Sequence, residues 1–209
     1  HLASAMDLTG NVLVNGGTLH VANSAAWPAE SPLVEVKASA TIDVSDVAGG
    51  AVIASGKTFA GSGTVAGDLT VNGIHDPGPG ASVTGTLAYG PASHVSWSLA
   101  SNSNTPGAFD SVSAASATIA AGSVLDLNFN GPGGTVDFSQ LFWSATRTWT
   151  VLSATSLGGA FTLGSVSVDS AGHPAANYGG FTVSSSGNTV VLTWTPVIPV
   201  AKWRGSAGA

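Results

Sequence analysis

The chain of 209 residues contains no cysteine, which excludes disulfides and thiolate metal sites. Charged residues are also scarce, at 8% of the chain, against roughly 25% in an average soluble domain. Its five lysines and arginines form no basic stripe, so we expect no nucleic-acid partner. No apolar run approaches the roughly 18 residues of a spanning helix, so we expect no membrane span.

Glycine is abundant instead, with 28 residues, and between positions 61 and 87 it separates short runs rich in Val and Thr. Each such glycine disfavours a helix, whereas short strands between tight turns tolerate it. Strands are also predicted over residues 12–14 and 18–21, and one half-buried strand over 33–44, where apolar and polar residues alternate. This close spacing of strands is typical of a solenoid of stacked β-rungs.

The second half of the chain becomes rich in aromatic residues. We predict that residues 7–134 form the solenoid and that residues 135–196 form a C-terminal β cap over its open end. Within this cap, a short helix is expected over 137–143 and strands over 148–152, 181–184 and 189–194. We interpret residues 1–6 as a cloning remnant and residues 197–209 as a non-native or unstructured tail.

The stretch Gly49–Leu87, with Gly56-Lys-Thr-Phe-Ala-Gly-Ser-Gly-Thr-Val-Ala-Gly67 and Pro79-Gly80-Ala-Ser82, resembles the autotransporter-associated β-strand repeats of bacterial surface passengers. The segments 149–152 and 192–196 are similar to the C-terminal part of such proteins. The resemblance implies a right-handed parallel β-helix that is exported to the cell surface and has no catalytic residues. The chain departs from the family at Ile74-His75-Asp76-Pro77-Gly78, where small or apolar residues are usual.

We therefore predict an all-β fold, a right-handed parallel β-helix with an aromatic-rich C-terminal β cap. The leading function is structural: a stalk or adhesive surface of an exported, cell-surface or extracellular protein. The open end of a solenoid exposes unpaired backbone groups, so we also expect self-association as a dimer.

A metal-dependent hydrolase is the alternative function. His75 and His94 lie 19 residues apart; if one coil has that length, their backbones stack about 4.8 Å apart. With Asp76 as third ligand and candidate catalytic residue, they would form the plan of a hydrolytic zinc centre for activated esters or phosphoesters. His20 or His173 would add a ligand, or all these histidines are simply surface imidazoles in turns.

A carbohydrate-binding module is the third possibility. Trp27 and Trp97 would then offer aromatic faces to sugars, but packing in the core is the interpretation that we favour. Nucleophilic catalysis by serine is not indicated, because no Gly-x-Ser-x-Gly elbow stands between a strand and a helix.

Overall fold

The computed structural model describes residues 9–197, so the predicted cloning remnant and all but the first residue of the predicted tail lie outside the described residues. Described residues form an all-β fold with three single-turn 3₁₀ helices, η1 (Ser24–Ala26), η2 (Leu141–Ser144) and η3 (Ala175–Asn177). The strands are β1 (Val12–Val14), β2 (Gly17–His20), β3 (Leu33–Val36), β4 (Ala40–Asp43), β5 (Ala51–Ile53), β6 (Thr58–Gly61), β7 (Thr64–Ala66), β8 (Leu69–Val71), β9 (Ile74–Pro77), β10 (Ala81–Tyr89), β11 (His94–Ser98), β12 (Val112–Ile119), β13 (Val124–Phe129), β14 (Arg147–Gly159), β15 (Thr162–Asp169), β16 (Gly179–Ser186) and β17 (Thr189–Pro196). Within this range no helix is long and apolar enough to cross a membrane.

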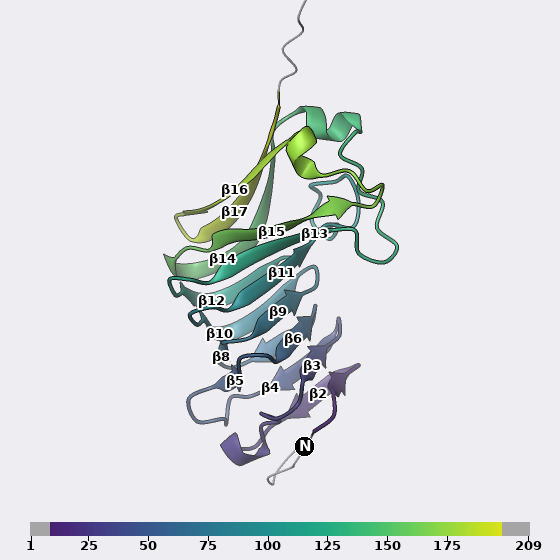
Figure 1. Ribbon diagram of the computed structural model, residues 1–209. Helices are drawn as coiled ribbons and strands as arrows, with labels where there is room; N and C mark the ends of the chain where they lie inside the picture. The colour runs from purple at the N-terminus through teal and green to yellow at the C-terminus, as the bar shows by residue number, and fades with distance from the viewer. Residues whose placement is uncertain (1–8, 198–209) are drawn as a thin grey trace, which may run out of the picture.

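These strands build two sheets. One runs β1-β3-β6-β9-β11-β13-β15, and every neighbouring pair in it is parallel. In the other, β2, β4, β7, β10, β12 and β14 are parallel neighbours, and β5 and β8 pair beside them. From β9 to β15 the chain steps from one sheet to the other at each strand, and the strands stack along an elongated molecule (Figure 1).

The stretch 33–44 forms two strands rather than the single strand predicted. β3 and β4 belong to different sheets, and the corner between them includes Ser39 at φ 66°. Val36 and Ala40 on either side of this corner are both buried. Apolar and polar residues therefore keep alternating through the corner, so the sequence pattern alone does not indicate it.

Glycine is required where a corner passes close to the preceding layer. Gly61 has φ +104°, and a Cβ built there would overlap the carbonyl oxygen of Val36. Gly56 also has a positive φ, at +77°, but a Cβ there would meet open space. These two glycines thus serve different purposes: Gly56 permits only a turn, whereas Gly61 also permits close approach of backbone.

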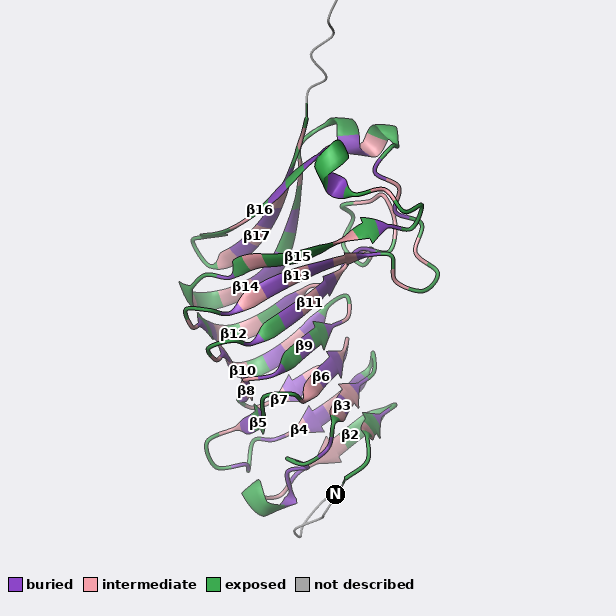
Figure 2. Ribbon diagram, in the orientation of Figure 1, coloured by how far each residue is buried: buried purple, intermediate pink, exposed green. Residues whose placement is uncertain are grey.

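At the C-terminal end, the second sheet continues with antiparallel strands, because β17 pairs with both β14 and β16. The strands predicted over 148–152, 181–184 and 189–194 lie within these three strands. The helix predicted over 137–143 is reduced to the short 3₁₀ helix η2, which begins at Leu141. Buried positions alternate with exposed ones along these strands (Figure 2), and the largest buried side chains there are aromatic rings. Trp194 stacks on Phe138 with ring centroids 5.7 Å apart and 5° between planes. We call residues 135–197 the cap, and we call β1 to β13 the wound strands, because the chain passes back and forth between the two sheets along them.

Candidate functional site

The predicted zinc centre does not form, because His75 and His94 are not stacked on each other. In the register of β9 and β11, His75 lies beside Val95 and His94 beside Ile74. An offset of one residue places two side chains on opposite faces of a sheet. His75 therefore points inward and His94 outward, and the residue paired with His75 is 20 positions along the chain rather than the 19 that we assumed.

His75 is a core histidine. It is 1% exposed, its Nδ1 shares a 2.7 Å hydrogen bond with the Tyr89 hydroxyl, and its ring packs 5.6 Å from that of Phe59. Burial lowers the pKa of His75 to about 4, which keeps the imidazole neutral. The outward-facing His94 instead places Nδ1 2.6 Å from Oδ2 of Asp126.

Asp76 faces away from the core, into a groove of about 400 Å³ that Asp110 also lines. The groove lies where the wound strands meet the loop 131–134, and the side chains of Ser96 and Asn128 complete its polar wall. Burial raises the pKa of Asp76 above its usual range.

Asp110 is the more deeply buried of the two acids, at 7% exposed. Burial raises its pKa to about 7, against a hydrogen bond from the Ser98 backbone, and the charge of Asp76 raises it further. The Ser98 N–H donates to Oδ2 of Asp110 over 2.7 Å. The groove therefore holds two carboxyl groups whose pKa values burial raises, and the sequence analysis did not find Asp110 as a site residue.

His20 is the last residue of β2, near the N-terminal end of the described chain and away from the groove. Its Nδ1 is 2.9 Å from Oδ2 of Asp43 and its Nε2 is 3.2 Å from Oδ2 of Asp46. The two carboxylates thus face opposite nitrogens of one ring. His20 does not join His75, Asp76 or His94.

The predicted aromatic platform is not formed either. Trp97 is 0% exposed and donates its Nε1–H to the Asp110 carbonyl over 2.6 Å. Trp27 is 8% exposed and donates to the Val52 carbonyl over 3.0 Å. Both rings are buried in the core, so neither can stack on a sugar.

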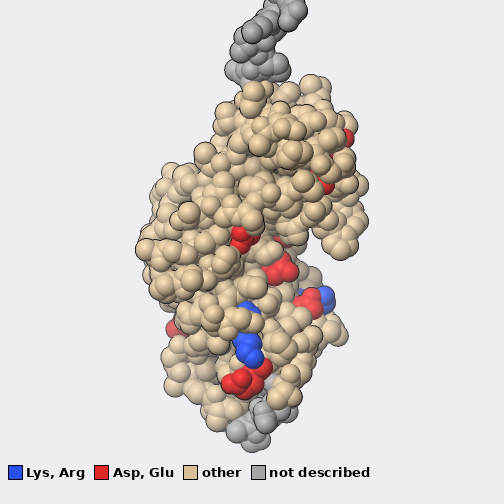
Figure 3. Space-filling view, in the orientation of Figure 1, with Lys and Arg blue, Asp and Glu red and all other residues tan. Residues whose placement is uncertain are grey.

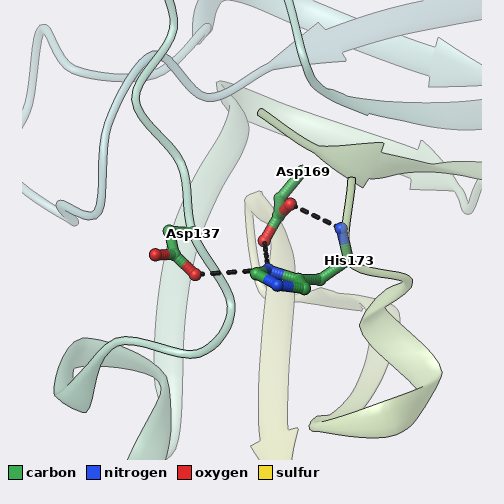
Figure 4. Close-up of side chains that lie close together, drawn as sticks. All are labelled: Asp137, Asp169 and His173. Atoms are coloured by element: carbon green, nitrogen blue, oxygen red, sulfur yellow. Dashed lines mark hydrogen bonds and ion pairs between the residues drawn. The ribbon is translucent and has the colours of Figure 1, made fainter. Parts of the chain in front are cut away.

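One histidine named in the sequence analysis does lie in a possible metal-binding cluster. His173 lies in the cap with Asp137 and Asp169, and one ligand atom from each falls within 4.8 Å of the others (Figure 4). Nδ1 of His173 is 3.1 Å from Oδ2 of Asp169 and 3.4 Å from Oδ1 of Asp137. The same ring nitrogen therefore faces both carboxylates.

Local hydrogen bonds hold the carboxylate of Asp169, the end residue of β15. Oδ1 accepts the backbone N–H groups of Ala171 and His173 over 2.9 and 2.8 Å. Oδ2 accepts the N–H of Phe138 over 2.6 Å. Burial works to raise the pKa of Asp169, but these hydrogen bonds outweigh it and hold the pKa below its usual value.

Asp137 is held in a similar way at the start of the cap. Its Oδ1 accepts from the backbone and hydroxyl of Ser139 over 2.9 and 2.6 Å, and its Oδ2 accepts from Gln140 over 2.8 Å. The bond from the Ser139 hydroxyl is the main cause that lowers the pKa of Asp137 to about 2. His173 itself is oriented by Tyr178, whose ring lies edge-on 5.7 Å away.

Sequence reasoning named His173 but missed both of its carboxylate neighbours. The Asp169-x-x-x-His173 spacing at the end of a strand was an available local signal. Asp137 is 32 residues from Asp169, and only the loop between β13 and η2 brings it near.

Comparison with known proteins gives no family assignment. No protein-family model matches the chain, and no curated protein matches it significantly.

Proposed function

We propose that this chain is a structural module of an exported bacterial surface protein, similar to the autotransporter-associated β-strand repeats. In this proposal its two sheets are faces of a right-handed parallel β-helix that displays surface at a distance from its anchor. The observation that supports it most is the unbroken parallel pairing from β1 to β15 in one sheet and from β2 to β14 in the other. Such pairing extends a molecule in one direction, as a stalk requires.

The surface chemistry supports the same function. Charged side chains are sparse on the face shown in Figure 3. Two of the three lysines and arginines within residues 9–197 contact acids: Lys37 pairs with Glu35, and Lys57 lies 3.8 Å from Glu30. The face in view therefore offers few charged side chains to bind a charged ligand.

We propose further that two copies associate through the N-terminal edges of the sheets. β1 and β2 are the end strands of their sheets in the described part of the chain. A second copy would pair with these edges and cover their backbone groups. Light scattering at high protein concentration should give the mass of a dimer, and a monomer would contradict this proposal.

A display experiment tests the main proposal. The chain, with an epitope inserted after the exposed Gly56, would be fused to an outer-membrane exporter. We expect an impermeant antibody to label intact cells, and the exported chain to resist added protease. A chain that reaches the surface but is degraded there would contradict a role in surface display. The matched control is the same fusion with Gly61→Val, which should be degraded because the corner cannot close.

A further inference from the structure

We propose that Asp137, Asp169 and His173 form a binding site for one divalent transition-metal ion, and that zinc fits this donor set best. The inference is independent of the structural role proposed above. Its ligands come from three segments: the loop before η2, the last residue of β15, and the loop that leads to η3. A metal ion there would fasten these segments of the cap to one another.

The two distances from His173 to the carboxylates match the edges of a coordination tetrahedron. Bonds of about 2.0 Å to nitrogen and carboxylate oxygen place neighbouring tetrahedral ligands roughly 3.3 Å apart. The separations from Nδ1 of His173 are 3.1 Å to Asp169 and 3.4 Å to Asp137. The third separation, between the two carboxylates, is within 4.8 Å, so the partly exposed Asp137 side chain would move to bind one ion together with the other two.

The charge balance also calls for a cation. Two carboxylates converge on one neutral or protonated imidazole, and within residues 9–197 no lysine or arginine forms an ion pair with either acid. Arg147, the cation of the cap, donates to the Phe142 carbonyl and covers the Phe142 ring instead. A divalent ion that replaces a proton on Nδ1 would neutralise both carboxylates at once.

The carboxylates around His20 are arranged differently from those around His173, and they cannot form a similar metal site. His20 also has two carboxylate neighbours, Asp43 and Asp46, but they face Nδ1 and Nε2 on opposite sides of the ring. One ion cannot contact both nitrogens of an imidazole and both acids. His94 has a single carboxylate partner in Asp126. Only the arrangement at His173 directs three donors of the described chain toward one point.

The outer ligands are open to solvent, and the inner one is fixed. The side chains of His173 and Asp137 are 37% and 26% exposed, whereas that of Asp169 is 0% exposed. An ion can therefore enter from the surface and keep a water molecule in the fourth position, as three-ligand zinc sites do. The backbone donors to Asp169 and the Ser139 bonds to Asp137 would orient the ligands from behind.

Calorimetric titration of the full, untagged chain with ZnCl2 after chelator treatment tests the site. We expect one zinc per chain, a higher melting temperature with zinc, and a tetrahedral absorption spectrum when Co²⁺ replaces zinc. His173→Gln and Asp137→Asn should each weaken zinc binding by at least about tenfold, since loss of even an outer-shell partner costs about 10- to 100-fold. Both positions are partly exposed, so circular dichroism should show that the variants remain folded.

A matched control makes the result decisive. His94→Gln removes an exposed histidine whose carboxylate partner, Asp126, lies outside the proposed site, and this variant should bind zinc as tightly as the wild type. The proposal is overturned if the wild type binds zinc no better than His173→Gln. It is also overturned if His94→Gln, rather than His173→Gln, abolishes binding.

Discussion

The wound strands before residue 135 and the cap after it bury their inner faces with different side chains. Inward positions of the early strands are mostly aliphatic, as at Val34, Ile42 and Val65. In the cap, the rings of Phe138, Trp143, Phe181 and Trp194 contact one another directly. The first region depends on close approach of backbone from layer to layer, and the second on large apolar area at one end. The two regions should therefore respond differently to mutation.

Loss of a ring from the cap should produce the largest effect. Trp194→Ala removes a fully buried ring and the donor to the Trp143 carbonyl, which it bonds over 2.8 Å. We expect the free energy of unfolding to fall by about 3–5 kcal/mol. Hydrogen exchange should show faster exchange in β14, β16 and β17, while β3 and β6 remain protected.

The control for this variant is Leu141→Ala, which changes a residue of the cap that is 83% exposed. Its effect should stay within about 0.5 kcal/mol. If Trp194→Ala accelerates exchange equally in β3 and β6, the cap and the wound strands unfold as one unit, and the distinction between them fails.

A substitution at a corner of the wound strands should be next in size. Gly61→Ala forces a Cβ against the Val36 carbonyl at a positive φ, and we expect a loss of about 2–4 kcal/mol in denaturant unfolding. Gly56→Ala, also at positive φ but in open space, should cost only about 1 kcal/mol. Equal losses would show that backbone conformation, and not close approach of the layers, sets the requirement for glycine.

Sequence reasoning predicted the wound strands better than their corners. Glycines and period-two runs are local signals, and they placed β1 and β2 to within one residue. The corner near Ser39 was missed because the same alternation runs through it. The side chains of His75 and His94 were misplaced because one additional residue between paired strands moves a side chain to the opposite face of the sheet.

The candidate sites were harder to predict for a related reason. Asp110 reaches its groove from the connection between β11 and β12, and Asp137 reaches His173 from a loop outside both sheets. A periodic pattern says nothing about where such connections lie in space. His173 was named from its chemistry alone, and only the structure supplies its partners.

The groove at the junction of the two regions offers the last test, with a small expected effect that depends on pH. The folded-state pKa of Asp110 is about 7, above its ordinary value of 3.8. Between these values the folded protein holds a proton that the unfolded chain has released, so this group's contribution to stability falls as pH rises toward 7. Asp110→Asn has no charge to bury, and we expect it to be more stable than the wild type at pH 8 by roughly 1–2 kcal/mol.

This advantage should shrink as the pH is lowered and disappear near pH 4, as unfolding curves in urea at several pH values would show. The buried His75 has a lowered pKa and destabilises the fold below about pH 6.5, but it does so equally in both proteins and cancels in the difference. Asp46→Asn, at a side chain that is 60% exposed, controls for the loss of one negative charge. A stability difference for Asp110→Asn that does not change between pH 4 and pH 8 would mean that Asp110 is ionised in the folded protein throughout this range, and that burial does not raise its pKa.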